Sequence, residues 1–336
     1  MPSDRTFVTE LATALGTTGG DLEIVLWSLE PPPSFRNLAP PQWSKLRDLF
    51  TGGQFEDDFR AGFGNGRAFL EAPEALSGRV PRLVEWTGGR RPPGDEVIPA
   101  DLRIDHVYLV SCKYLSKILH NVSPARLVDG LLSTTGVADT RDWFVRVAPG
   151  EYQALYSACV EAGADDAGVG LPMFAMTLAG DERRRLEQFL QPGWPAAAEP
   201  FYKEMCAVVS AETAKAWQSR LSADNAEAML RRLLRIGSAP YFILGASSRG
   251  SMRLRIGTPW DWRQQYRLLD FGVEAQAGGQ PRVGWAAAYE VRASGEERIV
   301  SGHVEIRWSH GRFSGPPEAK VYLDTPHEAV PGYHPL

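Results

Sequence analysis

The spacing of hydrophobic residues changes character along the chain. Over the first 80 residues, apolar side chains recur every three or four positions, which is typical of amphipathic helices. Helices are predicted over residues 7–15, 41–50 and 55–70, and a further apolar run covers 22–29. Gly62, Gly64 and Gly66 weaken the middle of the third helix, because glycine disfavours helical backbone.

From residue 82 the pattern changes to short strands, with turn residues between them. Strands are predicted over residues 82–86, 100–104 and 107–114. A helix over 124–132 follows, with Ser123 as N-cap and Pro124 at the first helical position. More helices are expected between residues 150 and 236, and strands dominate from 241 onward.

This order of elements predicts an α/β (α+β) protein with a mixed sheet flanked by helices and a β-rich C-terminal part. We expect a first part over residues 1–245 and a second over 246–336. The run Tyr241–Leu244 fits equally well as a further strand of the first sheet.

Composition narrows the classes of function. The apolar fraction of 43% and charged fraction of 23% are typical of a soluble globular protein, and no apolar run is long enough to span a bilayer. We therefore expect no membrane anchor. The first residues lack a basic segment followed by an apolar one, which predicts a cytoplasmic protein. A net charge of -5 means that nucleic-acid binding would need a local basic face.

The cysteines, Cys112, Cys159 and Cys206, are widely spaced and odd in number. This usage fits reduced thiols and excludes a zinc site of the CxxC type. Cys112 with His106 or His120 is a candidate nucleophile pair. Strand alternation disfavours it, because it points Cys112 away from Lys113, and buried cysteines are usually inert.

The strongest candidate chemistry lies in the hairpin predicted over residues 99–114, where Asp101 begins one strand and Lys113 ends the next. A carboxylate can hold a divalent cation, and a lysine can orient a water and offset charge on a phosphate. Paired strands would fix their separation. A lysine in an apolar strand is costly to bury without a partner. The plain alternative is a half-buried hairpin whose lysine reaches solvent.

Pro99-Ala100-Asp101, with Ser111-Cys112-Lys113 on the next strand, resembles the PD-(D/E)XK nuclease superfamily, which includes most restriction endonucleases. The order of three strands and a helix also matches that superfamily, and the resemblance covers about residues 55–135. It implies a restriction endonuclease-like fold, Mg²⁺ (or Mn²⁺) as cofactor and DNA as substrate. It also implies a homodimer, since two active sites cut both strands of a duplex.

The chain departs from the superfamily in two places. One residue separates Pro99 from Asp101, and Ser111 replaces the acidic residue before the lysine. A serine hydroxyl is a poor cation ligand, so the missing carboxylate must come from elsewhere. Glu85 on the preceding strand and Asp129 on the following helix are the candidates. The resemblance thus implies a catalytic set of Asp101, Ser111 and Lys113, with Asp101 and either Glu85 or Asp129 as metal ligands.

Strand parity gives a condition on this interpretation. A two-residue turn at Asp105-His106 puts Asp101 on the face opposite Lys113. A three-residue loop or a bulge puts Asp101 on the face of Ser111 and Lys113. The nuclease interpretation requires the second geometry.

Other polar positions are weaker candidates. A local basic face would draw on Arg90, Arg91, Arg103, Lys117 and His120, although ordinary solvated surface explains each equally well.

Near the C-terminus, His303, Glu305 and Arg307 alternate along a predicted strand, which suits contacts to phosphates or bases but is more typical of the wet face of a sheet. Glu318-Ala319-Lys320 has the acid-x-lysine spacing without the aspartate hairpin.

Four tryptophans would form a base-stacking surface if they lay together, although aromatic residues on strands are more often core. They are Trp260, Trp262, Trp285 and Trp308.

The sequence therefore favours a metal-dependent DNA endonuclease, with restriction or defence as the role that the resemblance suggests. The alternative is a non-catalytic nucleic-acid- or partner-binding protein on a nuclease-like fold, and Ser111 is the residue that supports it. An enzyme acting on RNA or on a nucleotide is a third hypothesis.

Overall fold

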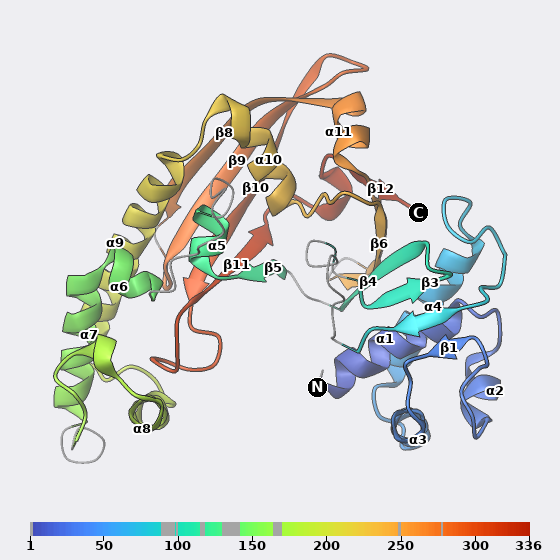
Figure 1. Ribbon diagram of the computed structural model, residues 1–336, viewed down its shortest axis with the longest axis horizontal. Coiled ribbons are helices and arrows are strands. Elements are labelled where there is room, and N and C mark those ends of the chain that lie inside the picture. The colour runs from blue at the N-terminus through green and yellow to red at the C-terminus, as the bar shows by residue number, and fades with distance from the viewer. Residues whose placement is uncertain are drawn as a thin grey trace. The chain divides into compact units, whose positions relative to one another are not determined.

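The computed structural model describes residues 3–88, 98, 100–114, 118–129, 142–163, 170–247, 250–276 and 278–336. The chain divides into two compact units, each built on its own β-sheet (Figure 1). The first unit comprises residues 1–117, 235–265 and 327–336, and the second comprises 118–234 and 266–326. The predicted α/β fold with a β-rich C-terminal part is confirmed.

In the described part of the first unit, the helices are α1 (Asp4–Gly16), α2 (Leu22–Trp27), α3 (Pro40–Thr51), α4 (Glu56–Glu71), α11 (Pro259–Gln265) and the 3₁₀ turn η2 (His327–Ala329). The strands are β1 (Phe35–Arg36), β2 (Val84–Trp86), β3 (Leu102–Ile104), β4 (Tyr108–Tyr114), β6 (Tyr241–Ser247), β7 (Gly250–Ile256) and β12 (Tyr333–Pro335). They form one sheet in the order β1-β2-β3-β4-β6-β7-β12. Strands β2, β3 and β4 are antiparallel, and β6 lies parallel to β4.

Helices α1 and α4 pack against each other and against this sheet (Figure 1). Phe7 and Leu11 of α1 join Phe69 of α4 in one buried cluster with Val110 of β4 and Leu244 of β6. Apolar side chains at helical spacing thus meet the inward face of the strands, which is the burial that the sequence pattern predicts.

The glycines of α4 allow its backbone to approach that of α1. A Cβ atom on Gly66 would stand 2.0 Å from the carbonyl oxygen of Thr13. Asn65 then fixes α4 on the sheet: its amide donates to the carbonyl oxygen of Gly245 at 2.9 Å and accepts from Arg253 Nε at 3.0 Å. The residues that weaken α4 as an isolated helix are therefore those that position it.

In the described part of the second unit, the helices are α5 (Pro124–Val128), α6 (Trp143–Val147), α7 (Pro149–Ala162), η1 (Ala175–Thr177), α8 (Gly180–Leu190), α9 (Glu199–Gln218) and α10 (Ala223–Leu233). The strands are β5 (Ile118–Val122), β8 (Tyr266–Gln276), β9 (Arg282–Val291), β10 (Glu296–Arg307) and β11 (Glu318–Leu323). Their order is β5-β11-β10-β9-β8, and neighbouring strands are antiparallel.

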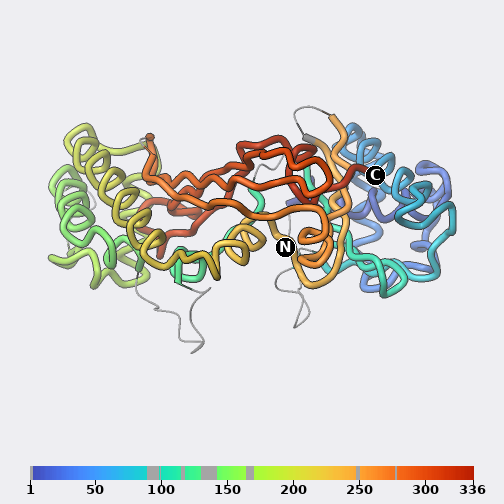
Figure 2. The backbone as a smooth tube through the Cα atoms, turned by 90° about the horizontal axis from the view of Figure 1, so that it is seen from above, coloured from blue at the N-terminus to red at the C-terminus, as the bar shows by residue number. Residues whose placement is uncertain are grey.

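Helix α9 runs along β8 and β9 (Figure 2). Trp217 of α9 lies 6.5 Å, ring to ring, from Phe271 of β8, which stacks on Trp285 of β9. Trp217 and Trp285 are almost completely buried. This aromatic layer forms a core separate from that of the first unit.

The division between the units differs from the one expected at residue 246. That position lies near the end of β6, which pairs with β7 over Tyr241–Ser247 within the first unit. Because β6 also pairs with β4, the run Tyr241–Leu244 belongs to the first sheet. The hydrophobic pattern of a sequence does not show which distant strands pair. The boundary predicted at residue 246 therefore rested only on where strands become frequent.

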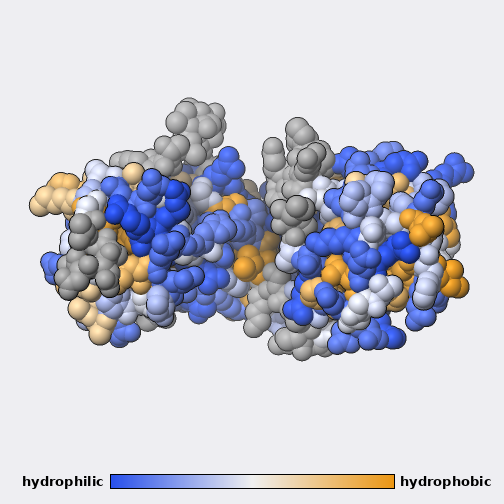
Figure 3. All heavy atoms as spheres, turned by 90° about the horizontal axis from the view of Figure 1, so that it is seen from below, coloured by the Kyte–Doolittle hydropathy of each residue, from blue (hydrophilic) through white to orange (hydrophobic). Residues whose placement is uncertain are grey.

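Apolar side chains also reach the surface of both units (Figure 3). They include Ile24, Trp27 and Leu29 around α2, and Met173 and Met176 before and within η1. None of the helices among the described residues has the length and apolar character needed to cross a membrane.

Candidate functional site

The hairpin between β3 and β4 has the three-residue loop that the nuclease interpretation requires. Ile104 pairs with Tyr108, so Asp105, His106 and Val107 form the loop. Asp105 and His106 both have positive φ angles, of 50° and 60°. The carboxylate of Asp105 accepts the backbone N–H groups of Arg82 and Leu83, which fixes it as a turn residue.

Asp101 lies just before β3 and is held against β4. Its carboxylate Oδ2 accepts the backbone N–H of Cys112 at 2.7 Å and the hydroxyl of Ser111 at 3.3 Å. Ser111 is completely buried. In this geometry Ser111 orients the carboxylate of Asp101 by hydrogen bonding, whereas the superfamily pattern would place a metal-binding acid here.

Asp101 and Lys113 line a cavity of about 260 Å³ together with residues of helix α1. The lining residues are Arg5, Thr6, Thr9, Glu10, Asp101, Cys112, Lys113 and Tyr114. The structure therefore brings together the acid and the lysine singled out from the sequence, and it adds Glu10 as a second carboxylate.

Glu10 is a buried acid, with 6% of its surface exposed. Trp86 Nε1 donates a hydrogen bond of 2.6 Å to its Oε2 atom. Burial, and next the negative charge of Asp101, raise the pKa of Glu10 to about 7, against the lowering effects of Trp86 and of the Lys113 charge. Such a carboxyl exchanges its proton near neutral pH and favours a nearby cation.

Sequence reasoning missed Glu10, although a signal for it was present. It is the only charged residue in the predicted helical segment 7–15, where apolar residues otherwise dominate. An acid in a buried helix needs a partner, which marks it as a candidate functional group. Its proximity to Asp101 depends on the packing of α1 on the sheet, which no local pattern shows.

His327 is a second residue that the sequence did not single out. Burial, and with it the positive charge of Lys113, lower its pKa below the usual value. The turn η2 therefore brings an imidazole within electrostatic reach of the lysine, from a segment more than two hundred residues further along the chain.

Glu85 is engaged away from this cavity. It pairs with Arg103 across β2 and β3, and its Oε2 atom lies 3.2 Å from Nδ1 of His106 in the hairpin loop. It is not among the described residues that line the cavity.

Asp129 belongs to the second unit, where it follows α5. Arg146 and Arg220 both contact its carboxylate, the latter at 3.0 Å. Its charge is therefore already compensated inside that unit. Neither Glu85 nor Asp129 is the acid that the structure places beside Asp101.

Of the other basic candidates near the hairpin, Arg90, Arg91 and Lys117 lie outside the described residues, and His120 belongs to β5 of the second unit.

Cys112 does line the cavity, but burial raises its pKa well above that of an ordinary thiol, and the charges of Asp101 and Glu10 raise it further. A thiolate nucleophile at Cys112 is therefore disfavoured.

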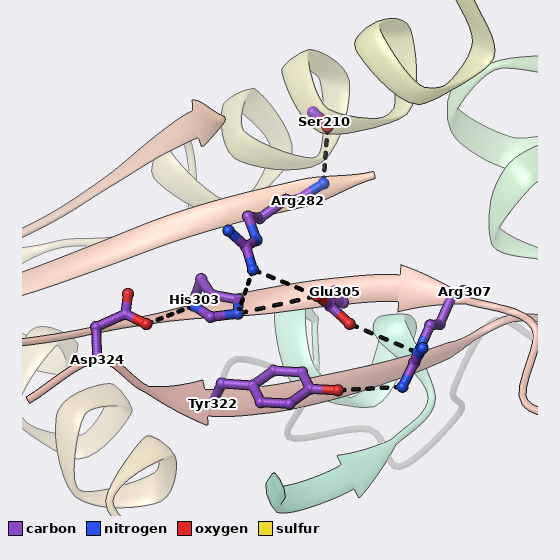
Figure 4. A network of polar contacts seen from close by, with 7 residues as sticks. All are labelled: Ser210, Arg282, His303, Glu305, Arg307, Tyr322 and Asp324. Atoms are coloured by element: carbon purple, nitrogen blue, oxygen red, sulfur yellow. Dashed lines mark hydrogen bonds and ion pairs between the residues drawn. The ribbon is translucent and has the colours of Figure 1, made fainter. Parts of the chain in front are cut away.

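On β10, His303, Glu305 and Arg307 belong to a network of charges that compensate one another (Figure 4). His303 Nδ1 lies 2.8 Å from Asp324, and its Nε2 lies 2.8 Å from a guanidinium nitrogen of Arg282. Because guanidinium only donates, Nε2 accepts and Nδ1 carries the proton.

Glu305 lies 3.4 Å from Arg282 and 3.5 Å from Arg307, which also donates to the hydroxyl of Tyr322. His303 is 8% exposed, so it is not a solvated side chain. The network therefore stabilises the sheet of the second unit, and Glu305 offsets part of the positive charge of Arg282 and Arg307.

The Glu10 and Asp101 pair was tested as a metal site. In the ranges that the structure describes, no group of three or more His, Cys, Asp or Glu side chains is arranged to hold a metal ion. Mg²⁺ commonly binds to one or two protein carboxylates and completes its shell with water and substrate phosphates. Two carboxylates beside a lysine fit that mode of binding, and they do not fit a cation enclosed entirely by protein ligands.

No protein-family model, curated protein or solved structure matches this chain.

Proposed function

We propose that the first unit is a nuclease that uses Mg²⁺ (or Mn²⁺) to hydrolyse phosphodiester bonds of DNA. The observation that carries this proposal is the presence of Glu10, Asp101 and Lys113 on one cavity of about 260 Å³. Two acids and one lysine supply cation ligands and a positive charge, both of which this chemistry uses. A restriction or defence role would follow from the same activity.

Glu10 and Asp101 would hold the cation through their carboxylates. The bound cation would supply Lewis acidity at the scissile phosphate and lower the pKa of a water. Trp86 orients Glu10, while Ser111 and the backbone N–H of Cys112 orient Asp101. Lys113 would position the attacking water and offset the negative charge that develops on the phosphate.

The resemblance to the PD-(D/E)XK superfamily rests on three antiparallel strands, β2, β3 and β4, which occur in the predicted order. The helix expected after them over residues 124–132 is α5 (Pro124–Val128), which belongs to the second unit, whereas helix α1 packs against the sheet of the first unit. Asp101 and Lys113 come from the second and third of these strands or their ends. Glu10 would take the place of the carboxylate that Ser111 does not provide.

Cleavage of plasmid DNA in Mg²⁺ tests this proposal. We expect Glu10→Gln, Asp101→Asn and Lys113→Ala each to lower the rate by about 100-fold or more. Glu85→Gln is the matched control, because it removes a carboxylate of the same sheet that does not line the cavity. It should cleave within about threefold of the unmodified chain.

A loss in Glu85→Gln as large as that in Glu10→Gln would contradict the assignment of Glu10. Full activity of Lys113→Ala would contradict the whole site. Asp129→Asn serves as a further control for the other acid considered, although loss of its two arginine contacts makes a melting curve necessary beside it.

A non-catalytic nucleic-acid- or partner-binding protein is the second candidate. Ser111 favours it, because a buried serine occupies the position at which the superfamily has an acid. Under this alternative, the chain would bind DNA without cleaving DNA, RNA or nucleotides in Mg²⁺ or Mn²⁺. Metal-dependent cleavage that disappears in Lys113→Ala would exclude it.

A further inference from the structure

A second cavity, of about 380 Å³, lies entirely within the second unit. Its walls come from the end of α8 and the segment that follows it, from α9, from the loop between β8 and β9, and from the residues after β10. This volume lies in the range of sites that bind small molecules. None of the residues proposed for DNA cleavage contributes to it.

Aromatic rings form one side of this cavity. Trp194 and Tyr202 lie 4.7 Å apart, ring centre to ring centre, with planes inclined by 30°. Trp308 lies 6.1 Å from Trp194 and packs on the buried Phe313 at 5.0 Å. Rings held in this way offer a firm surface on which a planar ligand can stack.

Trp308 is the only one of the four tryptophans considered from the sequence that lines the cavity. Trp260 and Trp262 belong to the first unit, and Trp285 is buried in the sheet. The four tryptophans therefore do not form one stacking surface. In this cavity Trp308 lies with Trp194 and Tyr202 instead.

Three buried polar atoms on residues of the wall have no hydrogen-bond partner in the described structure. They are the indole Nε1 of Trp308, the side-chain oxygen Oε1 of Gln280 and Nε of Arg307, the last of which lies 3.5 Å from Glu305 as an ion pair. Most buried polar groups are paired, so an unpaired donor and an unpaired acceptor on one cavity need an explanation. Because Nε1 of Trp308 and Oε1 of Gln280 are buried, a ligand that presents an acceptor and a donor on one edge would satisfy them once these two side chains turn toward the cavity.

Cationic groups are present as well. The guanidinium of Arg312 lies 4.8 Å above the Trp194 ring, and Arg307 lines the same cavity. Each already makes a contact, Arg312 with the carbonyl oxygen of Leu190 and Arg307 with Glu305. A guanidinium has five N–H donors, so these contacts leave capacity for a phosphate.

We propose that this cavity binds a nucleotide, with the base against the aromatic wall, the base edge at Gln280 and Trp308, and the phosphate at Arg307 and Arg312. A nucleobase has a flat aromatic face, which can stack on the aromatic wall. It also has adjacent donors and acceptors on its edge, which can pair with Trp308 and Gln280. The nucleotide is either free in solution or an unpaired nucleotide of a nucleic acid. This inference does not depend on DNA cleavage.

Calorimetric titration of the full chain carrying Lys113→Ala, in EDTA, separates binding from any cleavage. The ligands are dAMP, dCMP, dGMP and TMP, followed by a DNA duplex with one unpaired nucleotide and its fully paired counterpart. Trp308→Phe and Gln280→Leu should each weaken binding by about tenfold, because each removes one hydrogen bond to the ligand. Melting curves establish that the variants fold.

Trp285→Phe is the matched control. Its indole Nε1 is also buried without a partner, but Trp285 does not line the cavity. It should bind the ligand as the parent chain does. Binding of mononucleotides supports a free nucleotide as ligand, and binding of the unpaired duplex alone supports an extrahelical one.

Failure to bind any of these ligands would overturn the inference, as would an equal loss in Trp285→Phe and Trp308→Phe. Should Trp308→Phe not fold, Gln280→Leu carries the test, since it leaves the aromatic wall intact. A chain that binds nucleotides and never cleaves DNA would support this inference while contradicting the proposed nuclease.

Discussion

Glu10 is the residue on which the proposed chemistry of the first unit depends. Its carboxyl is buried beside Asp101, which makes its ionised form unfavourable in the folded chain. A nearby divalent cation would reverse that preference, because it attracts both carboxylates. Ionised Glu10 should therefore lower the stability of the metal-free chain and strengthen the binding of a metal ion.

The stability of the chain without metal should report this effect. The pKa of Glu10 is raised from 4.5 to about 7, so folding favours its protonated form. The stabilisation that protonated Glu10 gives is complete below its pKa in the unfolded chain. It is lost as the pH rises through its pKa in the folded chain. Over that window we expect the free energy of unfolding to fall by about 3 kcal/mol through this residue.

Urea unfolding in EDTA at about pH 5 and about pH 8 measures this change. Glu10→Gln should remove that part of the pH dependence and be more stable than the unmodified chain at the higher pH. Glu85→Gln should keep the dependence. Identical pH profiles for the unmodified chain and Glu10→Gln would show that Glu10 is not a perturbed acid.

Metal binding gives the converse expectation at the residue scale. At about pH 8, Mg²⁺ at about one hundred times its dissociation constant should stabilise the unmodified chain by about 2.7 kcal/mol. Glu10→Gln and Asp101→Asn should gain much less. A thermal-shift series with and without EDTA measures it, and equal shifts in all three chains would place the cation elsewhere.

At the scale of elements, the contact between α1 and α4 positions Glu10. Gly66 meets the backbone of Thr13, while a Cβ atom on Gly64 would meet nothing within 4 Å. The same helix therefore offers a matched pair of substitutions. Both replace glycine by alanine, but only the methyl group added at Gly66 meets helix α1.

We expect Gly66→Ala to destabilise the chain by about 2 kcal/mol or more, because neither backbone can yield without shifting a helix. Gly64→Ala should stabilise it by up to about 1 kcal/mol, since alanine is the better helix former. Denaturant unfolding measures both. A similar gain in both variants would mean that α1 and α4 do not pack as described.

The same pair of variants tests the link from packing to function. Where Gly66→Ala is still folded, its displaced α1 should lower metal-dependent cleavage, while Gly64→Ala should cleave normally. Unchanged cleavage in a destabilised Gly66→Ala would argue that α1 only supports the fold.

At the scale of the whole molecule, the resemblance to restriction endonucleases implies a homodimer. We expect sedimentation of the chain to give twice the mass of one chain. Adding an excess of Lys113→Ala chains should then shift the plasmid products toward nicked circles, because mixed dimers hold one active site. A single-chain mass and an unchanged product ratio would contradict the dimer.

The sequence by itself determined most helices and strands, because hydrophobic period depends on neighbouring residues alone. It also identified Asp101 and Lys113 as candidates. It further required a loop of three residues between their strands, and the register of β3 and β4 has such a loop. These predictions concern residues that lie close together in the chain, where turn geometry limits the alternatives.

Only the tertiary structure decided the second carboxylate. Glu85 and Asp129 are nearer to Lys113 in sequence than Glu10 is, yet Glu10 lines the cavity. Its position follows from the packing of α1, and thus from contacts across about ninety residues of chain. Such contacts depend on how complete side-chain surfaces fit together, which a one-dimensional pattern does not contain.

The division into units has the same cause. Strand β6 joins β4 although residues 118–234 of the second unit lie between them in sequence, and β12 returns to β7 from the C-terminus. Backbone pairing leaves no mark in composition, so the sequence placed a boundary where strands become frequent. Local residue order thus determined the elements and the hairpin, whereas the folded sheet decided which distant elements share a core and a site.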